Sequence, residues 1–111
     1  MKNRRLIYQA MLATLMAGMI ATAAVHAEGD AKAGEIKAIP CMGCHGIPGY
    51  SNVYPTYHVP RVGGQHPEYI IAALKAYKAK ERSHPTMQAQ ASSLSEEDMK
   101  NIAAYFASQA E

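Results

Sequence analysis

The residues from Cys41 to His45 constrain this chain more than any other feature of its sequence. They read Cys-Met-Gly-Cys-His, so two thiols stand three positions apart and an imidazole follows at once. This spacing is typical of covalent haem attachment, with a thioether bond from each sulfur and the imidazole as a ligand of the iron. We therefore predict that Cys41 and Cys44 bind one haem c and that His45 is an axial ligand of its iron.

Three other chemistries could use the same thiols. A structural zinc site needs two more ligands, which histidines would have to supply because no second Cys pair exists. A thioredoxin-like redox pair needs alternating strands and helices, which the sequence lacks. A disulfide between Cys41 and Cys44 would close a tiny loop and add little stability. The histidine directly after the second cysteine favours haem over all three.

The first 27 residues are predicted to be a cleaved secretory signal peptide. A basic start leads into an apolar stretch from Ala10 to Val25, and Val25-His26-Ala27 suits a signal peptidase. An uncleaved membrane anchor is the alternative, although the stretch is short for a span and contains Gly18. The prediction divides the chain into a signal, 1–27, and one monohaem domain, 28–111, exported to the periplasm.

Removing the signal changes the charge of the protein. Three of the 11 basic residues lie in it and all 9 acidic residues lie beyond it, so the net charge falls from +2 to −1. The basic balance of the whole sequence therefore does not indicate nucleic-acid binding. We predict no nucleic-acid partner and a mature chain that does not span a membrane.

A domain this small, with no Trp and one Phe, has a marginal apolar core, which a buried haem would complete.

The exported domain is predicted to be all-α. A first helix runs from a possible N-cap at Asp30 to about Pro40, which we expect to end it. A middle helix runs from Pro67 to about Arg82. A last helix follows Ser95 and Asp98, a variant of the capping box, and its apolar face is formed by Met99, Ile102, Ala103 and Phe106.

Two segments between these helices are expected to be irregular. Residues 46–65 contain several Pro and Gly that forbid a helix, no strand pattern survives in them, and we interpret them as a loop that covers the haem. Residues 83–93 form the second segment. Four cations lie near the end of the middle helix: Lys75, Lys78, Lys80 and Arg82. A solvated helix face is the commoner explanation for them, and a docking patch is the alternative.

The second ligand of the iron has to come from a Met or a His. Met87 is the predicted ligand, because a segment between two helices could present its thioether to the iron. His84 is the alternative. Met42 lies inside the attachment motif and cannot reach around the ring, and Met99 belongs to the core face of the last helix. Surface or capping roles are predicted for the remaining two, His58 and His66.

Ligation by His45 and Met87 would fill both axial positions of the iron. An open position for oxygen or peroxide chemistry would then be missing, which leaves one-electron exchange between ferric and ferrous iron. We therefore expect an electron-transfer protein without catalytic residues and not an enzyme.

Several stretches, taken in order, resemble one family. They cover nearly the whole exported domain: Gly34 to Gly46, residues 60–65 (Pro-Arg-Val-Gly-Gly-Gln), Tyr69 with Leu74, residues 82–87, and residues 94–108. Many families share the haem motif, but the ordered set is more specific. The chain resembles the class I c-type cytochromes, and is most similar to single-domain cytochrome c4- and c5-like bacterial electron carriers of the c553 and c554 type.

The resemblance implies a small cytochrome c fold. The N- and C-terminal helices would cross, and a middle helix and long loops would wrap around one covalently attached haem. Met87 would be the sixth ligand, and the carbonyl oxygen of Pro60 would accept a hydrogen bond from Nδ1–H of His45. Gly34 would lie where the first helix crosses the last, against Ile102 and Tyr105. The Tyr-rich segment 50–57 is not part of the family pattern, and cytochromes c4 carry two such domains where this sequence has one motif.

The expected function is that of a soluble periplasmic monohaem cytochrome c. As a monomer it would pass single electrons between respiratory or dehydrogenase partners through transient contacts. Two alternatives are a haem subunit of a periplasmic dehydrogenase complex, and a haem enzyme or gas sensor with a labile Met87.

Overall fold

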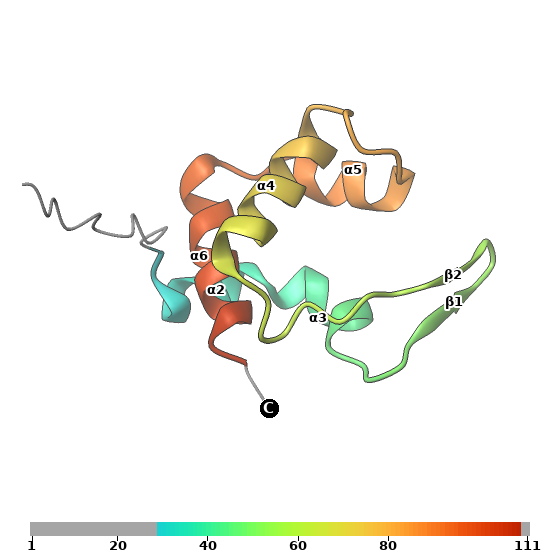
Figure 1. The fold of residues 1–111 in the computed structure, drawn as a ribbon, viewed down its shortest axis with the longest axis horizontal. Coiled ribbons are helices and arrows are strands. Elements are labelled where there is room, and N and C mark those ends of the chain that lie inside the picture. Colours follow the sequence, from blue (N-terminus) through green and yellow to red (C-terminus); the bar gives the residue numbers. More distant parts are fainter. Residues whose placement is uncertain (1–28, 110–111) are drawn as a thin grey trace, which may run out of the picture.

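The computed structural model describes residues 29–109, so the predicted signal peptide, 1–27, lies outside the described residues. Within that range the chain forms five helices and one two-stranded sheet (Figure 1): α2 (Ala31–Lys37), α3 (Ile39–His45), β1 (Ser51–Val53), β2 (Thr56–His58), α4 (Pro67–Lys78), α5 (Pro85–Ser92) and α6 (Glu96–Ala107). The predicted all-α class is confirmed, with one short hairpin added. None of the helices in residues 29–109 is both long and apolar enough to cross a membrane.

Helices α2 and α6 cross at close range and join the two ends of the domain. Gly34 of α2 is buried, and a Cβ atom there would overlap the carbonyl oxygen of Asn101 and lie 2.9 Å from Cβ of Tyr105. Glycine alone lets the two backbones approach this closely. The expected position of Gly34 against the last helix is confirmed for Tyr105, while Asn101 rather than Ile102 provides the nearest atoms.

Polar groups fix α2 to α6 at both ends of α2. Asp30 is the N-cap, as predicted, and its side chain accepts hydrogen bonds from two backbone N–H groups of the first turn. The N–H of Asp30 donates to Oδ1 of Asn101 (2.8 Å). At the other end, Lys37 pairs with Asp98 at the start of α6, with 3.0 Å between Nζ and Oδ1.

Helix α6 begins with the predicted capping box. Oγ of Ser95 accepts a hydrogen bond from the N–H of Asp98 (3.0 Å), and the carboxylate of Asp98 accepts one from the N–H of Ser95 (2.9 Å). The bond from the Ser95 backbone, followed by the bond from Lys37, lowers the pKa of Asp98 to about 2. The predicted apolar face of α6 is buried: Met99, Ile102, Ala103 and Phe106.

Helix α4 packs against α5 and α6 through the buried side chains of Ile70 and Leu74. It ends at Lys78, before the predicted Arg82, because the chain turns at Lys80, whose φ of 61° is left-handed. In this turn the N–H groups of Glu81 and Arg82 both donate to the carbonyl oxygen of Ala76.

Pro40 does not end the first helix, which corrects the prediction. Helix α2 ends at Lys37, and Pro40 lies in the first turn of α3, where no intrahelical hydrogen bond needs its missing N–H. The break falls at Ala38, which is fully buried. The whole motif from Cys41 to His45 therefore lies on one short helix.

The segment 83–93, predicted to be irregular, is mostly helix α5. His84 is its N-cap, and its Nδ1 accepts a hydrogen bond from the N–H of Met87 (3.4 Å). Pro85 occupies the first turn, which suits proline, and the Gln and Ala residues that follow favour a helix. The prediction of an irregular segment was wrong, because Pro85 after the N-cap residue His84 is part of a helix start.

The predicted loop 46–65 contains an antiparallel hairpin whose tip projects away from the helices (Figure 1). Its strands pair Asn52 with Tyr57, the two half-buried residues, while Tyr54 at the tip is 95% exposed. Strands of three residues are too short to show an alternating pattern. The β-branched and aromatic residues on both sides of Tyr54-Pro55 are the signal that could have predicted the hairpin. The rest of the segment is irregular, as predicted.

Replacing Gly34 by Ala should destabilise the domain. The added methyl group would overlap the backbone of Asn101, so α2 and α6 would have to move apart. Overpacking of this kind costs roughly 1–3 kcal/mol, which chemical denaturation of the purified protein would measure. Glu35→Ala, at an exposed position of the same helix, is the control and should change the free energy of unfolding by less than about 0.5 kcal/mol. Equal effects of the two substitutions would contradict a close crossing at Gly34.

Asp98 should stabilise the fold in a pH-dependent way. Its pKa in the fold, about 2, lies below the ordinary value of 3.8, so the ionised carboxylate favours the folded state and this contribution is lost as the pH falls through that interval. Asp98→Asn should therefore lower the melting temperature at neutral pH, and its difference from wild type should shrink between pH 3.8 and about 2. Glu97→Gln, at an exposed carboxylate of the same turn, is the control. A difference that stays constant down to about pH 2 would contradict this role.

Candidate functional site

A cavity of about 330 Å³ lies among α3, α4, α5, α6 and the loop after β2. Its walls are mainly apolar, and several of them also belong to the core: Ile70, Leu74, Ile102 and Phe106. The cavity brings together four of the predicted site residues, namely Cys41, His45, Pro60 and Met87. Cys44 lies on the same helix, is half-buried and does not line the cavity.

The ring of His45 is held in a fixed orientation at the end of α3. Its Nδ1 lies 2.9 Å from the carbonyl oxygen of Pro60, and the edge of the Phe106 ring packs against it with 6.5 Å between ring centroids. A carbonyl oxygen can only accept, so Nδ1 is the donor in this hydrogen bond, and in the neutral ring Nε2 is the nitrogen with the lone pair. A histidine oriented in this way is ready to bind a metal through Nε2.

The two cysteines are free thiols, both half-buried. Cys41 packs against the apolar core, and burial raises the pKa of its thiol, with the neighbouring Cys44 as a second cause. A negative thiolate is therefore disfavoured at Cys41. A neutral thioether at this position would suit the surroundings better.

Met87 lines the cavity from the first turn of α5 and is half-buried. The hydrogen bond from its backbone N–H to His84 fixes the turn that carries it. The prediction placed Met87 in an irregular loop, whereas the structure gives it the firmer support of a helix start.

The other candidate ligands have different surroundings. His84 lines the cavity but uses Nδ1 as the helix cap, and His66 is exposed at the N-cap position of α4. His58 is exposed, with its Nδ1 3.3 Å from Oγ of Ser51. Met99 is buried in the core, 1% exposed.

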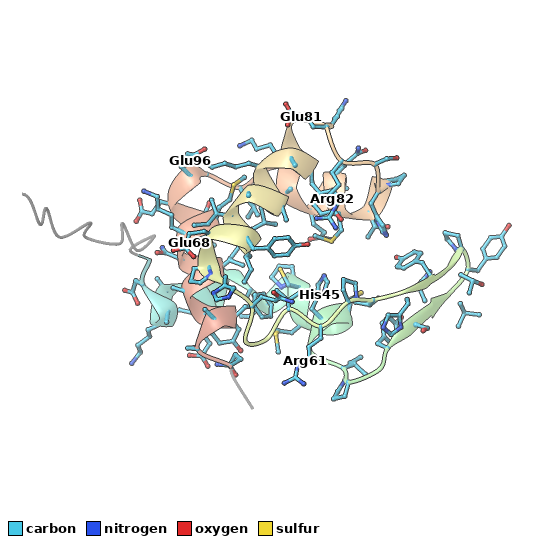
Figure 2. All side chains as sticks on the ribbon, viewed as in Figure 1. His45, Arg61, Glu68, Glu81, Arg82 and Glu96 are labelled. Atoms are coloured by element: carbon cyan, nitrogen blue, oxygen red, sulfur yellow. The ribbon has the colours of Figure 1, made fainter. Side chains whose placement is uncertain are left out.

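The sequence did not predict that a group of polar and aromatic residues would lie together on the α4–α5 side of the cavity. The ring of His84 meets Tyr57 of the hairpin and Tyr77 of α4 edge to face, with 4.8 and 6.4 Å between centroids. Arg82 lies over the ring of Tyr77, 4.8 Å from its centroid, and a hydrogen bond with Tyr69 is the main cause that raises the pKa of Arg82. Arg82 and His45, both labelled in Figure 2, line the same cavity from different elements.

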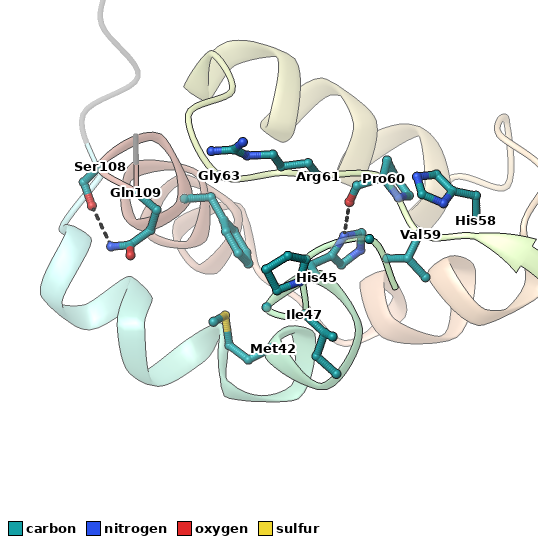
Figure 3. Close-up of a pocket in the computed structure, with 14 residues that line it drawn as sticks. Met42, His45, Ile47, His58, Val59, Pro60, Arg61, Gly63, Ser108 and Gln109 are labelled. Carbon is teal, nitrogen blue, oxygen red and sulfur yellow. Dashed lines mark hydrogen bonds between the residues drawn. The ribbon is translucent and has the colours of Figure 1, made fainter. Parts of the chain in front are cut away.

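A second cavity, of about 460 Å³, adjoins the first at His45 and Pro60 (Figure 3). Its further walls are formed by Met42, Ile47 and the end of α6. The loop after β2 lines both cavities and is tied to α6, because the N–H of Gly64 donates to the carbonyl oxygen of Phe106 (2.9 Å). Contact with α6 therefore positions Pro60 next to His45.

The residues around the first cavity fit a haem c. Free thiols and an oriented imidazole lie on one helix, a thioether lies on another, and an apolar space is between them. These are the donor types by which proteins hold haem. In residues 29–109, no three His, Cys, Asp or Glu side chains form the kind of group that the zinc alternative requires.

Comparison with known proteins gives the same assignment. Residues 34–110 match the Cytochrome c family. The chain is 37% identical over 99 residues to cytochrome c4 of Pseudomonas aeruginosa, and the matched region covers 89% of this chain and 48% of that protein. It is 40% identical over 84 residues to cytochrome c-554(548) of Halomonas halodenitrificans, and this match covers 73% of this chain and 98% of that protein.

The fold agrees with these relatives. The crystal structure of reduced recombinant cytochrome c4 from Pseudomonas stutzeri superposes with a TM-score of 0.57 at 26% identity, over 72% of this chain and 48% of that one. The chain thus spans about half the length of the cytochromes c4 that it matches. The predicted cytochrome c fold is confirmed. The chain belongs to the cytochrome c family, as a class I c-type cytochrome similar to cytochrome c4, and the cofactor of that family is covalently attached haem c.

Proposed function

We propose that the chain is a periplasmic electron carrier. Cys41 and Cys44 attach its haem, and His45 and Met87 are the two axial ligands of the iron. The observation that carries the proposal is the apolar cavity of about 330 Å³ that is lined by both an oriented His45 and Met87. The resemblance to cytochromes c4, which are electron carriers, supports the same function.

The bound haem would supply one chemical capability, the gain or loss of a single electron between ferric and ferrous iron. The chain's own residues set the conditions for it. Pro60 keeps His45 oriented through Nδ1, and His84 fixes the turn that presents Met87. Apolar walls from α4 and α6 exclude water. With both axial positions held by the protein, substrates have no access to the iron, which favours a carrier over an enzyme or a gas sensor.

The proposed docking face lies around the attachment motif. Four exposed apolar side chains lie on α3 or within three residues of its ends, close to the attachment motif: Ile36 (68%), Ile39 (66%), Ile47 (47%) and Met42 (37%). Exposed apolar groups that lie together mark interaction surfaces. A redox protein with an apolar face of its own would bind there in a small, transient interface.

The cations at the end of α4 are less suited to docking. Lys75 pairs with Glu96, and Lys78 donates to the carbonyl oxygen of Leu94. Arg82 interacts with two tyrosines beside the cavity. Three of these four side chains therefore have partners within the domain, which supports the solvated face over the docking patch.

Replacing Met87 by Ala should open the sixth position of the iron. We expect the reduction potential to fall, the sulfur-to-iron charge-transfer band to disappear, and the reduced protein to bind carbon monoxide rapidly. His84→Ala is the matched comparison, because it removes the helix cap, at a cost of roughly 1 kcal/mol, and leaves the thioether in place. If His84→Ala opened the site and Met87→Ala did not, His84 would be the ligand.

Replacing Ile39 by Ser should slow electron exchange between two copies of the protein. Line broadening in nuclear magnetic resonance spectra of mixed ferric and ferrous protein measures this rate without a known partner. We expect a decrease of roughly tenfold, equivalent to about 1.4 kcal/mol. Val53→Ser, at an 84% exposed apolar residue of the hairpin, is the control and should leave the rate unchanged.

The opposite pattern, with the rate sensitive to Val53 and insensitive to Ile39, would place the docking face on the hairpin. Stable co-purification with another polypeptide in fixed stoichiometry would identify the chain as a subunit of a redox complex in place of a free carrier.

A further inference from the structure

Arg82 is a permanent cation at the edge of an apolar cavity. It lines the cavity together with Met87, and its guanidinium group lies 4.8 Å above the ring of Tyr77. The side chain of Tyr69, from the start of α4, lines the same cavity and is the main cause that raises the pKa of Arg82. Among the described residues, no carboxylate forms an ion pair with Arg82.

The backbone of Arg82 is fixed on both sides. Its N–H donates to the carbonyl oxygen of Ala76 in the turn that ends α4. Its carbonyl oxygen accepts a hydrogen bond from Nε2 of Gln88 on α5 (2.9 Å). The two tyrosines then limit where the guanidinium group can go. Arg82 is exposed, and its backbone and the Tyr77 ring hold it at the edge of the cavity.

Haem carries two propionate groups whichever residues bind its iron. A carboxylate brought to an apolar cavity needs a cation or several hydrogen bonds to offset its lost hydration. The planar guanidinium group of Arg matches a carboxylate with two parallel hydrogen bonds. We propose that Arg82 binds a propionate of the haem, and that Tyr69 and Tyr77 position the guanidinium group for it. This inference rests on the proposed function only in placing the haem in this cavity.

Arg61 is the competing cation. It also lines the cavity, but it follows Pro60 on the His45 side and faces the second cavity as well. Arg82 lines the Met87 side alone, where the tyrosines support it. Binding by Arg61 and binding by Arg82 can be distinguished, because a bound propionate would lie close to the protons of the arginine that binds it.

The direct test is a nuclear Overhauser measurement on the ferrous, diamagnetic holoprotein. The guanidinium protons of Arg82 should exchange slowly with solvent and give cross-peaks to the methylene protons of one propionate. Cross-peaks from Arg82 to tyrosine ring protons alone, or from Arg61 to both propionates, would overturn the proposal. A shift of the Arg82 signals on titration with inorganic phosphate would also overturn it, since a paired guanidinium group is not free for another anion.

Variants supply a second readout. Arg82→Gln should lower the reduction potential, because an unpaired propionate charge favours ferric iron, and Arg82→Lys should retain most of the wild-type value. Lys80→Gln removes an equal charge two residues away, outside the cavity, and should have a much smaller effect. Equal potentials for Arg82→Gln and Lys80→Gln would contradict the proposal. The charge-transfer band should persist in all three variants, whereas its absence from the wild type would instead reject Met87 ligation.

Discussion

The close crossing of α2 and α6 is the contact on which the rest of the domain depends. It needs Gly34, because any side chain there would meet the backbone of Asn101. Since α3 follows α2 after the single buried residue Ala38, the crossing also determines where the attachment motif lies. Cys41 then packs against the core, and the ring of His45 meets Phe106 of α6. Phe106 also accepts the hydrogen bond from Gly64 that brings Pro60 to His45.

The domain has an incomplete core beside this crossing. Several side chains belong both to the buried cluster and to the wall of the cavity, including Ile70, Leu74 and Ile102. A chain of this size, with no Trp and one Phe, has few large side chains with which to fill such a space. A haem held there would bury these apolar walls, so binding of the cofactor and stability of the fold are coupled. The same residues therefore serve folding and function.

Polar side chains divide into two groups by what they bind. Lys37, Lys75 and Lys78 form contacts on the outside of the helices and stabilise the fold. His84 and Arg82 face the cavity, where one fixes the turn of Met87 and the other interacts with tyrosines. The surface around α3 instead exposes apolar side chains, which is the reason for assigning partner docking to it.

Local signals in the sequence were sufficient for much of this protein. The cysteine spacing predicted the haem, Asp30 and the Ser95–Asp98 pair predicted helix starts, and the period of apolar residues predicted the buried face of α6. Each of these depends on residues within one or two turns of one another, so the sequence displays them directly. Proline is ambiguous as a local signal, because it disrupts the interior of a helix but is well suited to the first turn of one. Pro40 was misread for this reason, and the helix that begins at Pro85 was missed.

The tertiary structure alone decided which distant residues meet. Loop contacts with α6 bring Pro60 to His45 across 15 positions of sequence. The packing of α4 against α5 and α6 places Met87 in the same cavity as His45, and after the left-handed turn at Lys80 the exposed side chain of Arg82 lies at the edge of that cavity. No periodic pattern encodes such contacts, because they depend on how separate elements pack. The sequence by itself therefore determined the cofactor and three of the helix starts, and the packing of the helices decided the surroundings of the cofactor.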